Sequence, residues 1–155
     1  MTRLGFAPHP ALLLSKETTM RLSTAAELGI RGMVYLARNY DNGPVPMTKI
    51  CRDQKLPRQY MLKIFASLGR SGFVRTTRGK GGGFVLGRPP EKISILDIIQ
   101  AIEGPLVLNF CQSDPPACRW DEDHCPIRPL WSELQEFTVS KLGAFSLDKV
   151  NHRPD

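Results

Sequence analysis

The sequence predicts a mostly α-helical protein with one small β-hairpin, and three observations support this fold class. Apolar residues recur at three- and four-residue steps in several stretches, which is the period of an amphipathic helix. Residues 73–77 and 84–86 are short β-prone runs, and the basic, glycine-rich turn 78–83 joins them. The stretch 105–126 carries several prolines and shows no helical period, so we expect a loop there.

The first predicted helix follows a segment without clear periodicity. Residues 1–19 contain two prolines, and we interpret them as a flexible N-terminal extension. Thr24-Ala-Ala-Glu27 is a capping-box pattern that begins the helix, and the turn-forming run 41–46 ends it. The apolar residues near one face of this helix are Leu28, Val34, Tyr35 and Ala37.

Two further helices and the hairpin complete the first domain. A short helix is expected at about 47–54, and Pro57 is well placed at the first position of the next. In that third helix the core-facing residues are Met61, Ile64, Phe65 and Leu68. A helix, a short helix, a helix and a hairpin with a basic tip form the plan of a winged helix-turn-helix, which we assign to residues 20–104.

The C-terminal part is predicted to contain one short and one long helix. Ser94 caps a helix over residues 95–103, whose isoleucines form an apolar stripe, and Gly104 and Pro105 end it. The loop 105–126 follows. Residues 127–150 are predicted as a long dimerisation helix, to about residue 143, and a C-terminal tail. Its apolar face has no obvious partner within the chain, so we expect it to pair with a second copy.

The charge of the chain is unevenly distributed. The net charge is +6 over 155 residues, yet the segment 49–80 holds nine Lys or Arg residues and a single acid, Asp53. Between residues 114 and 136 six acids outnumber two arginines. The basic segment suits a polyanion such as double-stranded DNA, although a solvated charged face is the simpler alternative. No apolar run is long enough to span a membrane, and no signal peptide is evident, so we expect a cytoplasmic protein with reduced thiols.

The winged-helix plan predicts which residues would meet DNA. The third helix would enter the major groove with its N-terminus first, and the hairpin tip would lie in or beside the minor groove. The alternatives are an ordinary turn with solvated charges and a phosphate loop, but the Gly-Lys-Ser/Thr of a phosphate loop is missing. The predicted DNA-binding residues are Arg58, Gln59, Tyr60, Lys63, Arg75, Arg78, Gly79 and Lys80.

Cys111, Cys118 and Cys125 lie seven residues apart, a spacing that would place them on one face of a helix. Pro115, Pro116 and Pro126 exclude that helix, so the thiols belong to a loop able to fold around a ligand. Thiolates suit an iron–sulfur cluster, and they also suit zinc or copper(I), although paired Cys-x-x-Cys knuckles are absent. A cofactor-free thiol switch or an inert loop remains the alternative. The candidates for a fourth ligand are Asp121, Glu122, Asp123, His124, Glu27 and a residue of a partner chain.

Other chemistry is less well supported. Cys51 lies beside Ile50 on the short helix, and we interpret it as a core residue rather than a ligand or sensor. The three histidines are scattered, and no Ser/His/Asp or paired-carboxylate arrangement is present, so we expect no enzyme. An electron carrier would leave the basic segment unexplained.

Several motifs resemble one family of winged-helix regulators, the family that includes IscR, NsrR and RirA. The resemblance covers roughly residues 20–150. It rests on Met20-Arg-Leu-Ser-Thr, Tyr60-Met-Leu-Lys-Ile-Phe-Ala-Ser-Leu, Gly72-Phe-Val, Arg78-Gly-Lys-Gly-Gly-Gly-Phe and Ile95-Leu-Asp-Ile-Ile-Gln-Ala-Ile-Glu-Gly. It implies a symmetric homodimer that binds a pseudo-palindromic operator and acts as a transcriptional repressor or dual regulator.

The resemblance also implies a cofactor and its ligands. A 2Fe-2S or 4Fe-4S cluster would be held by Cys111, Cys118 and Cys125, and it would respond to nitric oxide, redox state or iron supply. Where IscR-like members place a histidine ligand this chain has Arg128. NsrR-like members use a carboxylate near the start of the other subunit's first helix, and the matching position here is Glu27. His124 ranks second as a fourth ligand. The alternative is a regulator of the same fold without a cluster, controlled by zinc, thiol oxidation or a partner protein.

Overall fold

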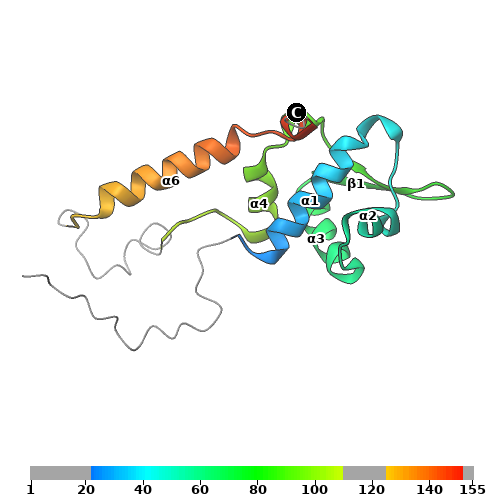
Figure 1. Ribbon diagram of the computed structural model, residues 1–155, viewed down its shortest axis with the longest axis horizontal. Coiled ribbons are helices and arrows are strands. Elements are labelled where there is room, and N and C mark those ends of the chain that lie inside the picture. Colours follow the sequence, from blue (N-terminus) through cyan, green and yellow to red (C-terminus); the bar gives the residue numbers. More distant parts are fainter. Residues whose placement is uncertain (1–21, 110–124, 152–155) are drawn as a thin grey trace, which may run out of the picture.

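The computed structural model describes residues 22–109 and 125–151 and divides them into a compact head and a projecting arm (Figure 1). The predicted extension 1–19 and most of the cysteine loop lie outside the described residues. The head contains the first four helices and the hairpin, and residues 125–143, most of which form helix α6, make up the arm. The elements in chain order are α1 Thr24–Arg38, η1 Tyr40–Asn42, α2 Met47–Gln54, α3 Arg58–Arg70, β1 Val74–Thr77, β2 Gly83–Leu86, η2 Pro90–Lys92, α4 Ile95–Glu103, α6 Arg128–Gly143 and η4 Leu147–Asn151, where η denotes a 3₁₀ turn.

These elements confirm the predicted fold class, a mostly helical winged helix-turn-helix with one antiparallel hairpin and a long C-terminal helix. Two helix starts differ from the prediction by one residue. Ser23, not Thr24, caps α1, because the Ser23 hydroxyl accepts a hydrogen bond of 3.2 Å from the amide of Ala26. Pro57 has extended backbone and precedes α3 as its N-cap. No helix in the described ranges is both long and apolar enough to cross a bilayer.

The core of the head lies where α1, α3 and α4 meet. Met33, Phe65 and Ile98 are at most 1% exposed. Gly32 allows α1 to approach α3 closely, because a Cβ there would lie 2.7 Å from Cε2 of Phe65. Gly29 has the same role toward α4. The predicted core face of α3 points inward. On α1, Tyr35 and Ala37 are buried as predicted and Leu28 and Val34 are half-buried, but the prediction missed the buried side chains of Met33 and Leu36. Gly29 and Gly32 set how near α1 lies to its neighbours.

The hairpin is joined to the segment before α2 by an isolated β-bridge that the sequence did not indicate. β1 and β2 pair in register from Val74↔Leu86 to Thr77↔Gly83. Val45, just before α2, forms an isolated antiparallel bridge to Phe84, with two backbone hydrogen bonds of 2.9 Å. A Cβ at Gly83 would lie only 2.5 Å from the Val45 carbonyl, so glycine permits this approach. The bridge ties the base of the wing to the start of α2.

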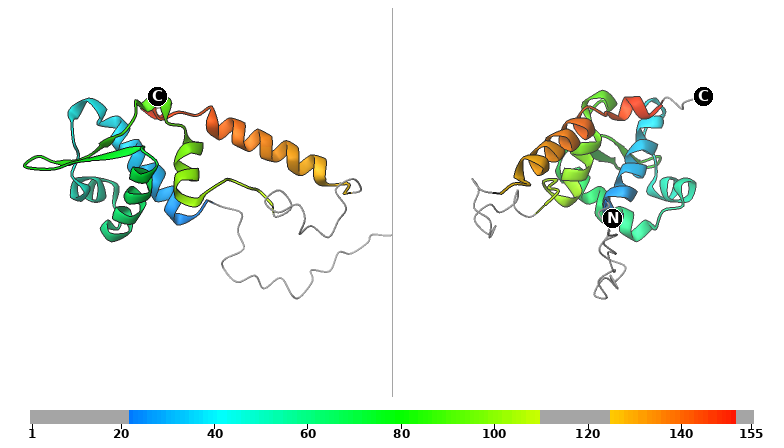
Figure 2. Two further views of the ribbon diagram at one scale, coloured as in Figure 1. Left: turned by 180° about the vertical axis from the view of Figure 1, so that it is seen from behind. Right: turned by 60° about the vertical axis from the view of Figure 1, so that its left-hand side comes forward.

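The chain returns to the head after α6. The amide of Ile95 donates to the carbonyl of Phe145, and the amide of Leu147 donates to the carbonyl of Ile93, both at 2.9 Å. The side chain of Leu147 is completely buried, and η4 packs on α1 and η2. The residues predicted as a C-terminal tail thus add a core side chain to the head. Figure 2 shows the result: the hairpin and the arm project from opposite ends of the head.

Candidate nucleic-acid interface and cysteine site

The N-terminal turn of α3 presents polar side chains to solvent. Its core residues are buried on one face, which leaves Arg58, Gln59 and Lys63 exposed and Tyr60 36% exposed. Leu62, whose direction the sequence leaves open, is half-buried and packs against the core. The exposed face of α3 is therefore polar and cationic, as the amphipathic pattern predicts.

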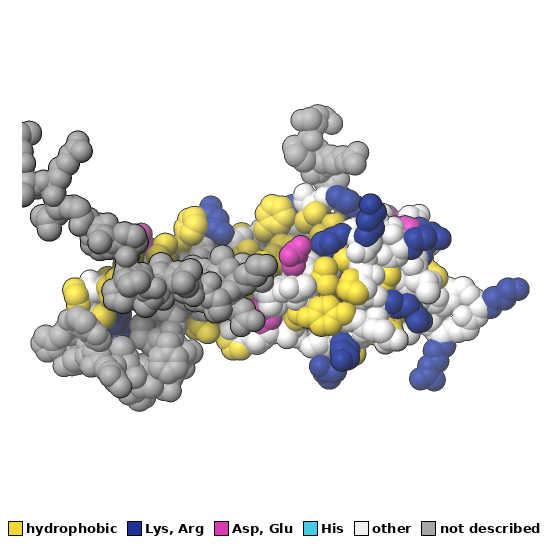
Figure 3. Space-filling model, turned by 60° about the horizontal axis from the view of Figure 1, so that its bottom comes forward, with side chains coloured by type: hydrophobic (Ala, Val, Ile, Leu, Met, Phe, Trp, Pro, Cys, Tyr) yellow, Lys and Arg dark blue, Asp and Glu magenta, His cyan; other side chains and the backbone are white. Residues whose placement is uncertain are grey.

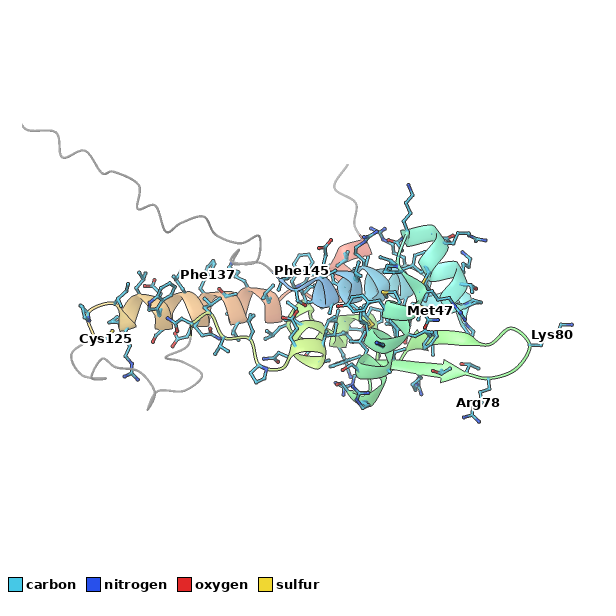
Figure 4. The ribbon with its side chains drawn as sticks, turned by 90° about the horizontal axis from the view of Figure 1, so that it is seen from below. Met47, Arg78, Lys80, Cys125, Phe137 and Phe145 are labelled. Atoms are coloured by element: carbon cyan, nitrogen blue, oxygen red, sulfur yellow. The ribbon has the colours of Figure 1, made fainter. Side chains whose placement is uncertain are left out.

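The hairpin carries the second group of predicted DNA-binding residues. Arg75 on β1 is exposed, and so are Arg78, Gly79 and Lys80 in the turn. Arg78 and Lys80 point outward from the tip of the hairpin (Figure 4). Gly79 has a φ of 103°, in the region that favours glycine, and its carbonyl accepts a hydrogen bond of 2.9 Å from the amide of Gly82. The glycines therefore shape a narrow tip whose only long side chains are cationic.

The cationic side chains gather at one end of the molecule. In Figure 3, Lys and Arg side chains surround the head at the end that bears the hairpin, and acidic side chains are few on this face. The end of the head that bears the hairpin is therefore electropositive on this face. Such a surface suits the phosphate backbone of a nucleic acid.

A hydrogen-bonded network on α1 and α2 adjusts the charge of this end. The Tyr35 hydroxyl donates to Oδ2 of Asp53, and Nζ of Lys49 lies 2.9 Å from the Tyr35 hydroxyl and 3.0 Å from Oδ2 of Asp53. Nε of Arg52 donates to Oδ1 of Asp53 at 3.0 Å. The hydrogen bond from Tyr35 and then those from Lys49 and Arg52 hold the pKa of Asp53 far below its usual range.

The same contacts raise the pKa of Lys49, chiefly through the hydrogen bonds with Tyr35 and Asp53. Asp53 therefore partly neutralises two cations of the basic segment and stays ionised itself. The sequence shows Asp53 only as one negative charge. No periodic pattern links it to Tyr35, which lies on another helix.

Of the predicted metal ligands, the described residues include Cys125 and Glu27. Cys125 is half-buried at the start of the arm, and its carbonyl accepts a hydrogen bond of 3.3 Å from the amide of Arg128. Cys111, Cys118 and His124 lie outside the described residues. Within the described ranges, no three His, Cys, Asp or Glu side chains come together.

Glu27 is exposed in the first turn of α1. α1 lies in the head, whereas Cys125 lies at the far end of the arm (Figures 1 and 4). A single chain therefore does not bring Glu27 next to Cys125.

The position of Cys51 in the structure agrees with its interpretation as a core residue. It is 8% exposed within the hydrophobic core of the head, and burial raises the pKa of its thiol. A raised pKa lowers the fraction of reactive thiolate at neutral pH. Cys51 is therefore a poor ligand or sensor in this fold.

The arm exposes an apolar stripe. Large hydrophobic side chains recur along it at helical spacing, and none of the residues of α6 is buried. The exposed fractions are 48% for Ile127, 50% for Leu130, 39% for Leu134 and 60% for Phe137. A stripe of this kind is typical of a helix that packs against another helix.

Comparisons with known proteins agree with this architecture. Residues 22–153 match the model of the Rrf2 family, described as an iron-dependent transcriptional regulator. The chain is 31% identical over 131 residues to the HTH-type transcriptional regulator IscR of Xenorhabdus nematophila. The aligned region covers 84% of this chain and 79% of that protein. It is 29% identical over the same length to IscR of Klebsiella pneumoniae, with the same shares covered.

Solved structures of similar fold include two kinds of regulator. CymR, the global cysteine regulator of B. subtilis, has a TM-score of 0.71 at 28% identity, covering 84% of this chain and 95% of that one. IscR of T. potens has a TM-score of 0.66 at 27% identity, covering 83% of this chain and 84% of that one. Because the family model matches residues 22–153, and the relatives and solved structures of similar fold agree with it, the chain belongs to the Rrf2 family of transcriptional regulators.

Proposed function

We propose that this regulator is a homodimeric repressor that binds a double-stranded DNA operator through α3 and the wing. The observation that supports the proposal most is the exposure of Arg58, Gln59 and Tyr60 at the start of α3, together with the exposed cationic side chains of the wing. Arg and Gln side chains at the N-terminus of a recognition helix are suited to base edges and phosphates in the major groove. Arg78 and Lys80 would meet the adjacent minor groove or its phosphates.

A homodimer would suit this mode of binding. The exposed stripe Ile127, Leu130, Leu134 and Phe137 would bury its apolar surface against the same stripe of a second copy. A symmetric dimer would present two α3 helices to two half-sites, about one helical turn of DNA apart. The distance between the two heads would then decide whether both α3 helices reach their half-sites.

The proposed cofactor is an iron–sulfur cluster held by Cys111, Cys118 and Cys125. The donor chemistry fits, because three thiols in a reducing compartment are ligands for iron, and the described thiol, Cys125, is only half-buried. When bound, the cluster would supply redox reactivity and reactivity toward nitric oxide. Glu27 is proposed as a fourth ligand from the partner subunit's first helix. Its exposure permits that role, and its separation from Cys125 within one chain makes a second chain necessary.

The arm offers a route from the cysteine loop to the DNA-binding surface. Cys125 begins the arm, and the other end of the arm is fastened to the start of α4 by the hydrogen bonds of Phe145 and Leu147. A change at the loop that alters how two arms pack would therefore move the two heads relative to each other. Shifts of a few ångströms between recognition helices are enough to change operator affinity.

The test is purification without oxygen, followed by absorbance, iron analysis and DNA binding before and after exposure to nitric oxide or air. We expect a coloured, iron-containing dimer whose operator affinity changes with the cluster. Cys118→Ser should abolish the visible absorbance and alter DNA affinity together. Cys51→Ala is the matched control, because it removes a cysteine that lies in the core. If protein purified without oxygen contains zinc or no metal and still binds DNA tightly, the proposal of a cluster is wrong.

A second candidate is a regulator of the same fold without a cluster, controlled by thiol oxidation, zinc or a partner protein. The similarity to CymR, a cysteine regulator of B. subtilis, supports this candidate. It predicts that DNA affinity follows the oxidation state of the thiols or the zinc content in protein that contains no iron. Mass spectrometry of alkylated protein, alongside DNA-binding assays in a reducing and an oxidising buffer, distinguishes the two candidates.

A further inference from the structure

The turn between α2 and α3 holds a lysine in a backbone conformation that favours glycine. Lys55 has φ 54° and ψ 50°, and it is the one residue other than glycine with a positive φ among the described residues. Its amide donates a hydrogen bond of 3.3 Å to the carbonyl of Arg52. The amide of Leu56 donates one of 2.8 Å to the carbonyl of Cys51. These two hydrogen bonds form the Schellman motif that ends many helices, and Lys55 occupies its left-handed position.

The end of α3 shows the same motif with the usual residue. The amide of Gly72 donates to the carbonyl of Gly69 at 3.0 Å. The amide of Phe73 donates to the carbonyl of Leu68 at 2.9 Å. Gly72, with a φ of 74°, is therefore the counterpart of Lys55. Glycine is preferred there because a Cβ disfavours left-handed backbone, so lysine in the turn before α3 is a strained choice.

The contacts of the Lys55 side chain within the fold do not account for this choice. The side chain is exposed, and its ammonium forms no ion pair or hydrogen bond within residues 22–109 and 125–151. Asp53 lies two residues away, but its carboxylate is engaged by Tyr35, Lys49 and Arg52. The charge of Lys55 is therefore not neutralised by that acid. Strained backbone at an exposed residue that gives the fold no contact points to a function outside the fold.

The place of Lys55 in the chain suggests what its charge meets. Leu56 is 6% exposed, so the core anchors the turn immediately after Lys55. Arg58, the first residue of α3, follows Lys55 by three positions, and three residues span at most ~11 Å. The major groove of DNA is ~12 Å wide. With the start of α3 in the groove, Lys55 would lie at the edge of the groove, where the phosphates are.

We propose that Lys55 binds a backbone phosphate at the edge of the major groove that α3 enters. The proposal rests on the proposed function and adds a contact outside α3 and the wing. A lysine ammonium suits this role, because it is a compact charge on a flexible stem. A phosphate contact carries no sequence information, so Lys55 should strengthen binding to the operator and to an unrelated duplex alike.

The test uses the full-length protein and two duplexes. One is enriched by the wild-type protein from a random-sequence library, and the other has the same base composition in scrambled order. Lys55→Gln removes the charge and keeps a side chain in the left-handed position, whereas Lys55→Gly also relieves the strain. For both duplexes, we expect each variant to make the negative slope of log binding constant against log salt shallower by about 1 per subunit. Lys55→Arg should retain the wild-type slope.

Urea unfolding of the same variants separates DNA binding from folding. Lys55→Gly should unfold at a higher urea concentration than wild type, because glycine adopts left-handed backbone without a Cβ penalty. A variant that is more stable than wild type and binds DNA more weakly has lost a DNA contact and not its fold. If Lys55→Gly is less stable than wild type, the lysine serves the fold, and the inference is wrong.

Lys92→Gln is the matched control, because it removes the same charge from an exposed position in η2. It should retain the wild-type slope. An equal change of slope in Lys92→Gln would show an effect of net charge alone and would overturn the inference. If the wild-type protein enriches no duplex, the proposed function fails together with the inference. If wild type, Lys55→Gln and Lys55→Gly bind DNA with the same slope, the inference fails and the proposed function stands.

Discussion

The hydroxyl of Tyr35 donates a hydrogen bond of 2.5 Å to Oδ2 of Asp53 and thereby joins α1 to α2. Tyr35 is 8% exposed, so its hydroxyl reaches the surface from an otherwise buried ring. The same carboxylate binds Lys49 and Arg52. One acid thus holds two helices together and moderates the charge of the electropositive end of the head.

This contact predicts a pH-dependent stability. The pKa of Asp53 is lower in the folded protein than in the unfolded chain, mainly because of the Tyr35 hydrogen bond. A lowered pKa stabilises the fold above the ordinary aspartate value of about 3.9, and that stabilisation is lost as the pH falls below it. Tyr35→Phe should therefore be less stable than wild type at pH 7, and the difference should shrink below about pH 4.

The measurement is urea unfolding at pH 7, 5 and 3. Tyr40→Phe is the control, since Tyr40 is 45% exposed and its loss should change stability little at any of these pH values. A difference between wild type and Tyr35→Phe that stays constant from pH 7 to pH 3 would contradict the proposed linkage.

Removing a cation from the proposed DNA surface should weaken binding in a salt-dependent way. The logarithm of the binding constant falls as the logarithm of the salt concentration rises. We expect Arg58→Ala and Lys80→Ala each to make this negative slope shallower by about 1 per subunit, because each lost phosphate contact releases one counterion fewer. The measurement is a series of operator-binding titrations from low to high salt. Lys92→Ala, an exposed cation in η2, serves as the control and should leave the slope unchanged.

The stripe on α6 should hold the dimer together. Phe137→Asp places a charge on the most exposed aromatic residue of the arm, and burying that charge in an apolar interface is strongly unfavourable. We expect the dimer dissociation constant to rise at least about a hundredfold, measured by sedimentation equilibrium. Tyr40→Asp alters a comparably exposed aromatic on the head. Tyr40→Asp should leave the dimer dissociation constant unchanged. If Tyr40→Asp raises that constant as much as Phe137→Asp does, the dimer interface lies elsewhere.

Leu147 should contribute to the stability of the head although it follows the arm. Its side chain is completely buried, so Leu147→Ala should lower the free energy of unfolding by about 2–4 kcal/mol. Leu22→Ala, at a position 39% exposed, should lower it by less than about 1 kcal/mol. Urea denaturation at one fixed protein concentration measures both. Equal losses would mean that residues 144–151 do not dock on the head in solution.

Local patterns account for most of what could be predicted. Ser94 caps α4 as predicted, and the structure adds the reciprocal hydrogen bond from its amide to the Asp97 carboxylate. The core face of α3 follows directly from its three- and four-residue spacing. The outward direction of Arg58 and Lys63 follows from the same spacing, because residues off the apolar stripe face solvent. The cap of α1 was displaced by one residue because Ser23 and Thr24 are both suitable caps, and sequence alone does not choose between neighbours.

By itself, the sequence determined the order of helices and hairpin, the core-facing residues of α3 and the exposed cations of α3 and the wing, since all of these follow from spacing and turn chemistry over a few residues. The tertiary structure alone decided the Val45–Phe84 bridge, the burial of Leu147 and the Tyr35–Asp53 contact. It likewise decided the hydrogen bond that the amide of Leu108 donates to the side chain of Gln135, 27 residues away. Each of these contacts joins elements that are distant along the chain. Their geometry depends on how whole helices pack together, and the spacing of apolar residues within one element does not predict that packing.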